Sequence, residues 1–334
     1  MFMIGALIIA IAASAISVKT LVGYTEMRSV YKILISLLIV SAWFAPVIVS
    51  VIRATAWGNT RFFAYVSDVG YFLFGIVFLL LILLLLRDFL WFFAYETAKL
   101  IKSPYAAALN PSDVRMLNLA NLYTVALTFL LGFYALYEGI KLPAVKEVTL
   151  ASPALKREYT LVQLSDLHIN RTIPPERIEK LVEKVNALEP DVILLTGDIG
   201  DDKVEAVGPQ MAALEELQSK YGIFAVFGNH EFYNGLMPWQ FKFGKMGWSA
   251  LFNYGLPVKD TELYVGGVPD VSIARGSPFF KIDVDRTLEN SSDGQYKILL
   301  SHTPRFQKEM ITKAQYDLQL SGHTHGGQIF PFHL

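Results

Sequence analysis

The second half of this 334-residue sequence contains seven side chains of the kinds that bind metal ions, and they follow five short apolar segments. These residues are Asp166, His168, Asp198, Asn229, His302, His323 and His325. In open α/β sheets the loops at the carboxyl ends of the strands converge on one crevice, so we expect these side chains to meet there. Nitrogen and oxygen ligands in this combination predict a two-metal centre, which could activate a water molecule for hydrolysis.

Each motif alone is weak evidence for a metal site. An isolated Asp-x-His or Gly-Asp is more often a turn, and an isolated Gly-Asn-His is more often loop chemistry. Their joint occurrence behind successive apolar segments favours the metal centre, because independent features then agree. Five of the six histidines, which are His168, His230, His302, His323 and His325, follow these apolar segments, and only His333 does not. The chain has no cysteine, so thiolate ligands and a cysteine nucleophile are excluded.

The elements that must position these ligands are short strands that alternate with amphipathic helices. Strands are predicted at residues 160–164, 192–195, 223–227, 297–300 and 317–320, and helices at 175–188 and 211–221. This alternation is typical of an α/β domain.

The first part of the chain differs in composition. Overall the sequence is 53% hydrophobic and 18% charged, which is unusual for a soluble enzyme. Four long apolar stretches, at residues 2–18, 33–52, 69–86 and 117–137, predict transmembrane helices. Two alternatives stay open: a cleaved signal peptide for the first stretch, although it lacks a basic beginning, and buried helices of a soluble domain. We therefore expect a membrane domain at 1–145 and an enzyme domain at 146–334.

The charges suggest an orientation and a class of partner. The loops after the first and third stretches carry more Lys and Arg than the second loop, so they are expected to be cytoplasmic. The catalytic domain would then be extracytoplasmic, although Lys141, Lys146, Lys156 and Arg157 favour the opposite orientation. A net charge of -1 argues against a general nucleic-acid partner. No oligomeric state is predicted.

The five motifs together resemble those of the calcineurin-like metallophosphoesterase family, and the resemblance covers about residues 160–330. The motifs are Asp166-x-His168, Gly197-Asp198-x-x-Asp201, Gly228-Asn229-His230-Glu231, a single His302, and Gly322-His323-x-His325. Within the family, the segments at residues 228–233 and 322–331 resemble the bacterial membrane-associated phosphodiesterase branch. The resemblance implies an α-β-β-α sandwich behind the multi-pass helical membrane domain, and a location in the bacterial inner membrane.

The resemblance also implies a role for each motif residue. Asp166, His168 and His325 would bind one divalent ion, and Asn229, His302 and His323 a second, with Asp198 bridging both. The ions would be Mn, Zn or Fe, and a water bridging them would attack phosphorus. His230 would protonate the leaving group or bind the phosphoryl group, or else orient a ligand.

Several neighbouring residues have supporting roles or more than one interpretation. Glu231 and Asp201 are expected to accept hydrogen bonds near the ligands rather than to bind metal. Phe232, Tyr233 and Trp239 could line a substrate pocket, pack in the core or form a lipid-facing edge.

The predicted activity is metal-dependent hydrolysis of a phosphodiester, pyrophosphate or phosphomonoester, on a substrate that is membrane-associated or lipid-linked. The alternative is a non-catalytic metal-binding membrane sensor or scaffold. A transporter is a third interpretation, which the scarcity of charges within the spans disfavours. The sequence stops nine residues after His325, so we expect the enzyme domain to be truncated at its C-terminus.

Overall fold

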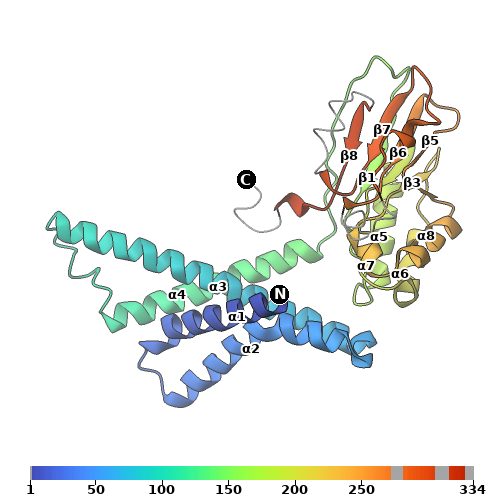
Figure 1. Ribbon diagram of the computed structural model, residues 1–334. Coiled ribbons are helices and arrows are strands. Elements are labelled where there is room, and N and C mark those ends of the chain that lie inside the picture. Colours follow the sequence, from blue (N-terminus) through green and yellow to red (C-terminus); the bar gives the residue numbers. More distant parts are fainter. Residues whose placement is uncertain (1, 272–280, 305–315, 328–334) are drawn as a thin grey trace. The chain divides into compact units, whose positions relative to one another are not determined.

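The computed structural model of the chain describes residues 2–271, 281–304 and 316–327 (Figure 1). His333 lies outside these ranges. The chain separates into two compact units, Met1–Lys141 and Leu142–Leu334, and each is described by itself.

The first unit consists of four long helices, and each is apolar and long enough to cross a membrane. They are α1 (Phe2–Val18), α2 (Ser29–Arg53), α3 (Arg61–Leu100) and α4 (Val114–Ile140). Helix α1 continues into a π-helical segment, η1 (Lys19–Gly23), and the first apolar span is Ile4–Gly23. A 3₁₀ turn, η2 (Ala56–Asn59), follows α2. The expectation of four apolar helices is confirmed.

Helix α3 is much longer than the stretch predicted for it. Its 40 residues correspond to about 60 Å, twice the hydrocarbon thickness of about 30 Å. The predicted stretch ends at residue 86, directly before Arg87 and Asp88, but α3 continues beyond them to Leu100. The Arg87 guanidinium donates to Asp88 and to Asn121 of α4, and Asn121 donates to the carbonyl of Leu21. These polar groups therefore bond to one another within the helical unit, which removes much of the cost of placing them in lipid.

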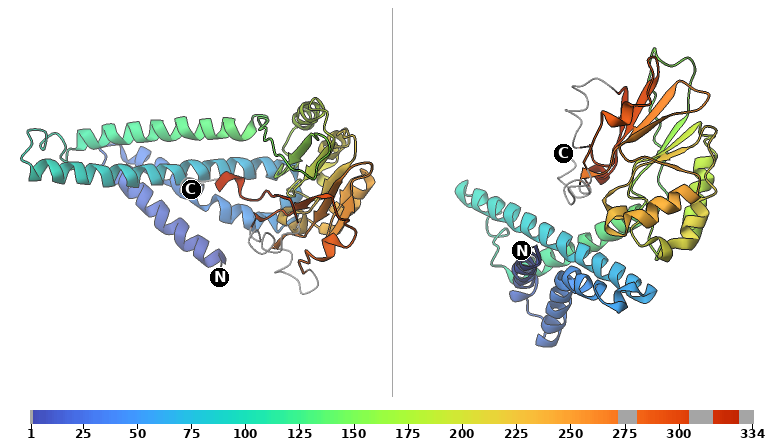
Figure 2. Two further views of the ribbon diagram at one scale, coloured as in Figure 1. Left: turned by 90° about the horizontal axis from the view of Figure 1, so that it is seen from above. Right: turned by 45° about the vertical axis from the view of Figure 1, so that its right-hand side comes forward.

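The second unit contains two four-stranded sheets, which Figure 2 shows from two further directions. The first has the order β1 (Leu161–Leu164), β2 (Val192–Leu195), β3 (Ile223–Ala225) and β4 (Ser249–Ala250), all parallel. The second has the order β5 (Tyr254–Pro257), β6 (Leu263–Gly267), β7 (Tyr296–Leu300) and β8 (Leu318–Leu320). Only β5 is antiparallel to its neighbour.

The side chains of β2 explain how the layers pack. Val192 and Leu194 join a core between the two sheets, whereas Ile193 and Leu195 join a core under the helices. Alternate residues of a strand face opposite sides, so a strand that is covered on both faces is apolar throughout. The helices over the first sheet are α5 (Pro175–Asn186), α6 (Gly208–Leu214) and α8 (Leu236–Lys245). Within the described residues, no helix longer than one turn covers the outer face of the second sheet.

The helix predicted at 211–221 is wrong in extent, because α6 begins at Gly208 and ends at Leu214. The Asn186 side chain donates to the carbonyl of Glu216 and accepts from the amide of Gln218. These bonds satisfy backbone groups in a turn, which competes with continuation of the helix.

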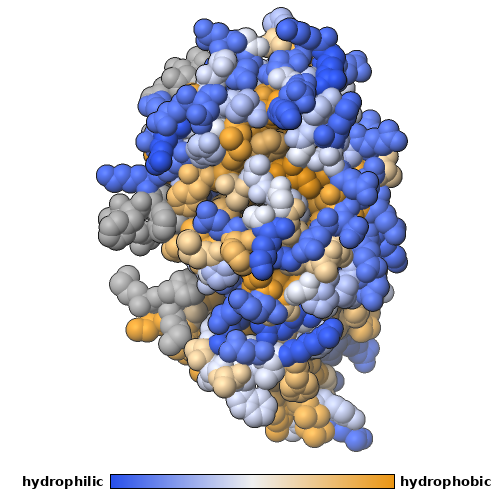
Figure 3. Space-filling view, turned by 90° about the vertical axis from the view of Figure 1, so that its right-hand side faces the viewer, coloured by the Kyte–Doolittle hydropathy of each residue, from blue (hydrophilic) through white to orange (hydrophobic). Residues whose placement is uncertain are grey.

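On the face drawn in Figure 3, many side chains are hydrophilic, and hydrophobic ones appear in patches between them.

The parallel strands β1, β2 and β3 end at one level, with Leu164 beside Leu195 and Leu195 beside Ala225. In the second sheet, Leu300 lies beside Leu320 in the same way. The loops that carry the predicted ligands follow these ends.

Candidate metal centre

Five predicted ligands have a left-handed backbone. Positive φ angles occur at Asp166 (53°), His168 (45°), Asp198 (51°), His323 (69°) and His325 (46°). Among the described residues, only four other non-glycine residues share this property. Such conformations cost about 1–3 kcal/mol each and persist where the surrounding structure imposes them. Their concentration here indicates that the loops are folded to aim these side chains at one place.

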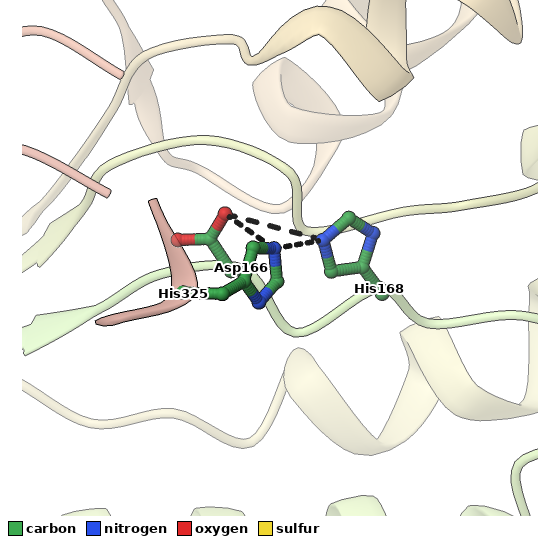
Figure 4. Close-up of side chains that lie close together, drawn as sticks. All are labelled: Asp166, His168 and His325. Carbon is green, nitrogen blue, oxygen red and sulfur yellow. Dashed lines mark hydrogen bonds and ion pairs between the residues drawn. The ribbon is translucent and has the colours of Figure 1, made fainter. Parts of the chain in front are cut away.

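The first cluster contains Asp166, His168 and His325 (Figure 4). The Nε2 atoms of the two histidines are 3.1 Å apart, and His325 Nε2 lies 3.4 Å from Asp166 Oδ1. Ser165 Oγ and the His323 amide donate to the Asp166 carboxylate and fix its orientation. Burial and, after it, the charge of His230 lower the pKa of His168. A neutral imidazole is the form that binds metal.

The second cluster contains Asp198, His302 and His323. His302 is fully buried, and its Nε2 lies 3.1 Å from both Asp198 Oδ2 and His323 Nδ1. The Nδ1 of His302 is 2.8 Å from the carbonyl oxygen of Thr196, so Nδ1–H donates to it. This bond leaves the Nε2 lone pair directed at the cluster, as in the metal-ligating histidines of other proteins.

Asp198 connects the two clusters. Its buried Oδ2 atom lies 3.1 Å from His302 Nε2 and 3.8 Å from His168 Nε2. Burial raises the pKa of Asp198, but the hydrogen bond and charge of His302 oppose it, and the net shift is downward. One carboxylate therefore faces ligands of both groups in its ionised form, as a bridging ligand must.

Asn229 begins helix α7 (Asn229–Tyr233) and is buried. Among the described residues its Oδ1 atom has no hydrogen-bond partner. Buried polar atoms without partners are rare in native proteins and call for an explanation. A cation ligated by this oxygen would supply one, so Asn229 fits the predicted ligand set.

The electrostatics of the second cluster also fit a cation. Burial lowers the pKa of His302, but the hydrogen bond and charge of Asp198 outweigh it and raise this pKa to about 9. The arrangement thus attracts a positive charge to the space between His302 and Asp198. A divalent ion bound there would take the place of the proton.

His230 forms a third group with His168 and Asp198, whose possible ligand atoms all lie within 4.8 Å of one another. Its backbone amide donates to Asp198 Oδ1, and its Nδ1 lies 2.5 Å from Asp201 Oδ1. Its Nε2 is 3.9 Å from Asp198 Oδ2, and its ring centroid is 4.5 Å from that of His168. Burial lowers the pKa of His230, whereas Asp201 raises it, and the net shift is upward. Because Asp201 binds Nδ1, Nε2 is the ring nitrogen that faces the clusters.

Glu231 is an acceptor for the loops that carry the ligands, as expected. The fully buried carboxylate accepts from the amides of Asp198, Gly200 and Gly228. Burial raises its pKa to about 7, against the lowering effect of these amides. Glu231 therefore ties the loop after β2 to the start of α7.

The aromatic residues near the site separate into two kinds. Trp239 is fully buried and packs against Phe243, and any side chain at Gly200 would overlap its ring. It is therefore a core residue and does not line a pocket. Tyr233 is exposed, with its ring centroid 5.9 Å from that of His230.

The supporting contacts of Ser165 and Thr196 could not be found from the motifs, because a backbone carbonyl and a nearby hydroxyl carry no sequence pattern.

Gly228 should be intolerant of a side chain. A Cβ atom there would lie 2.1 Å from Asp198 Oδ1 and 2.6 Å from the Asp198 amide nitrogen. We expect Gly228→Ala to lower the free energy of unfolding by about 2 kcal/mol through overpacking, and to reduce metal content. The matched control is Gly244→Ala in α8, where nothing lies within 4 Å and alanine should be neutral or stabilising. Denaturant unfolding and metal analysis of the purified chains check this, and equal behaviour of the two variants would contradict it.

Comparison with known proteins identifies the family. The sequence profile of the calcineurin-like phosphoesterases matches residues 159–327, about half of the chain. The chain belongs to the calcineurin-like phosphoesterase family. The matched region begins just before β1 and includes all seven predicted ligands and His230, so the resemblance of the motifs is confirmed.

The family relatives include membrane proteins. An uncharacterized metallophosphoesterase of Helicobacter pylori is 34% identical over 212 residues, 61% of this chain and 55% of the relative. A putative metallophosphoesterase of Caenorhabditis elegans is 31% identical over 272 residues, 76% of this chain and 54% of the relative. A Bos taurus transmembrane protein with metallophosphoesterase domain is 30% identical over 234 residues, which are 66% of this chain and 53% of the relative. The chain thus spans about half the length of these relatives.

Proposed function

We propose that this calcineurin-like phosphoesterase hydrolyses phosphate esters with two divalent ions held by its seven predicted ligands. The observation that carries the proposal is the position of Asp198 Oδ2, which faces His302 of one cluster and His168 of the other. A shared carboxylate can hold two cations about 3.5–4 Å apart, the spacing at which both engage one phosphate.

The ligands divide into two sets around Asp198. Asp166, His168 and His325 would hold one ion, and Asn229, His302 and His323 the other. When bound, Mn, Zn or Fe ions supply the charge that makes a water nucleophilic and neutralises phosphate oxygens. The residues of the chain keep the donor atoms in place: the carbonyl of Thr196 fixes the tautomer of His302, and Ser165 orients Asp166.

His230 is proposed as the acid that protonates the leaving oxygen. Asp201 binds Nδ1, so the proton available for transfer is on Nε2, the ring nitrogen that faces Asp198. An acid in this position must reach the leaving group directly or through one water. Retention of an imidazole beside a complete ligand set supports catalysis over a sensor or scaffold role.

The substrate is proposed to be a phosphodiester, pyrophosphate or phosphomonoester that is lipid-linked or otherwise at a membrane. The four apolar helices keep the enzyme unit near a bilayer, where phosphates of lipids are concentrated. We further propose the bacterial inner membrane and an extracytoplasmic enzyme unit. The greater number of basic residues in the first and third loops supports that orientation.

The first test is hydrolysis of bis-p-nitrophenyl phosphate by the purified full chain with added manganese, with metal content measured in the same samples. We expect turnover that EDTA removes and that Mn²⁺ restores, because the ligands hold exchangeable ions. Bound metal without turnover on any phosphate ester would favour the sensor or scaffold.

A second assay addresses the substrate. Phospholipids and lipid diphosphates in detergent are compared with soluble phosphodiesters of the same headgroup. Preference for the lipids supports the membrane substrate, whereas cleavage of soluble compounds alone would exclude it.

A further inference from the structure

Exposed hydrophobic side chains are concentrated in the segment that follows His230 of the candidate active site. From β1 onward, the exposed large hydrophobic residues that the structure describes are Tyr233 (66% exposed), Met237 (71%), Phe241 (65%) and Tyr254 (45%). The first three follow His230 within a short segment of α7 and α8. Isolated exposed hydrophobic residues need no explanation, but a concentration of them indicates an interaction surface.

Helix α8 is apolar on two faces. Trp239 and Phe243 are four residues apart and fully buried in the core of the second unit. Met237 and Phe241 are also four residues apart, so they share another face, and both are exposed. A helix that is apolar on more than its core face is expected where the other face is covered too.

The charges beside this face favour a lipid surface as the cover. Helix α8 carries Lys242 and Lys245 in its last turn and has no acidic residue. Lys245 Nζ lies 4.7 Å from the centroid of the Phe241 ring, while Lys242 is paired with Glu215. Lysines beside exposed aromatic and aliphatic side chains are typical of helices at the headgroup boundary, where the lysine contacts anionic phosphates.

Tyr233 lies between the exposed residues of α8 and His230 along the chain. The centroid of the Tyr233 ring is 5.9 Å from the centroid of the His230 ring. A bilayer is within reach, because α4 ends at Ile140 and β1 begins at Leu161 in the same chain. We propose that Tyr233, Met237 and Phe241, here called the α7–α8 surface, dock on an anionic lipid bilayer beside the active site. Such docking would present lipid phosphates to the active site as the substrate class, an inference that rests on the proposed function.

The absence of cysteine from the chain allows a direct test. Single cysteines at Met237 or Phe241 of the full chain are labelled with an environment-sensitive fluorophore. The control is Glu179→Cys at an exposed position of α5. Each protein is reconstituted into phosphatidylcholine and phosphatidylglycerol vesicles that contain lipids with a spin label near the headgroup. We expect the labels at 237 and 241 to be quenched several-fold more by these lipids than the label at 179.

Two outcomes would overturn the docking proposal. The labels at 237 and 241 could be as open to aqueous iodide as the label at 179, which would show a surface in water. They could instead be protected from iodide without quenching by the spin-labelled lipids, which would show another protein surface.

Activity provides a second readout, and it separates the two proposals. We expect Met237→Ser combined with Phe241→Ser to reduce hydrolysis of a vesicle-bound lipid phosphate several-fold and to keep the rate on bis-p-nitrophenyl phosphate. The exposed position Gln240→Ser of α8 is the control. If the wild type hydrolyses nothing, the proposed function fails while the quenching result still decides the docking. Equal loss on both substrates would overturn a docking role for these side chains.

Discussion

Asp198→Asn is expected to lower kcat/KM for bis-p-nitrophenyl phosphate by at least about 10³-fold, because Asp198 is the ligand proposed to bind both ions. The amide is neutral and has one oxygen, so it loses the charge that holds two cations together. Its NH₂ group would also face the imidazoles that approach the carboxylate, His302 at 3.1 Å and His168 at 3.8 Å. Metal content should fall together with activity.

The control for this variant is Asp260→Asn. Asp260 is exposed and has a φ of 61°, close to the 51° of Asp198, so both positions test the same chemical change on a left-handed backbone. Asparagine tolerates this conformation, so neither variant should suffer from backbone strain. Full activity and metal content in Asp198→Asn would show that Asp198 does not bridge the ions.

His230→Gln is expected to lower kcat by about 10²–10⁴-fold on a substrate with an alkyl leaving group. Glutamine keeps the backbone amide that donates to Asp198, but it cannot deliver a proton from the position of Nε2. The loss should be much smaller on bis-p-nitrophenyl phosphate, because p-nitrophenolate leaves without protonation. Metal content should remain that of the wild type.

The difference between the two substrates distinguishes acid catalysis from a supporting role. If His230 only oriented a ligand, its loss would reduce both rates equally and would lower metal content. Asp201→Asn provides a graded control, since it weakens the contact that holds Nδ1 but leaves the imidazole. We expect its effect to follow the same leaving-group dependence with a smaller magnitude.

The elements that could be predicted from the sequence are those whose apolar residues follow a single regular spacing. The segment 192–195 forms β2 with the expected bounds, because a strand buried on both faces is apolar at every position. The helix α5 and the four apolar helices follow from periodicity and length in the same way. The ligand motifs were recognisable because each follows a short, mainly apolar segment that was predicted as a strand.

Other elements could not be predicted, because tertiary contacts decide them. Strands β5 and β6 contain Gly255 and Gly267, which hide the usual strand pattern. A Cβ at Gly267 would lie 2.5 Å from Leu251 Cβ, and one at Gly255 would lie 2.2 Å from the Thr287 carbonyl oxygen. Close backbone approach thus requires glycine where a strand pattern would have a larger residue. The end of α6 depends similarly on Asn186, which is distant in sequence.

Within the site, the candidate ligands could be predicted from the sequence, but most of the contacts that hold them in place could not. An acceptor role was predicted for Glu231, but the motifs did not indicate which amides it binds, nor that Thr196 binds His302. These contacts join loops that are far apart along the chain. They are nevertheless what places the proposed ligands within range of one another.

The most direct test of the account is the number and coupling of the ions in the purified full chain loaded with Mn²⁺. We predict two ions per chain, with an electron paramagnetic resonance spectrum of an exchange-coupled pair, because Asp198 lies between the two clusters. Asp198→Asn should lose that coupling. A single ion per chain, or two ions with the spectrum of isolated Mn²⁺, would contradict a shared centre and with it the proposed function.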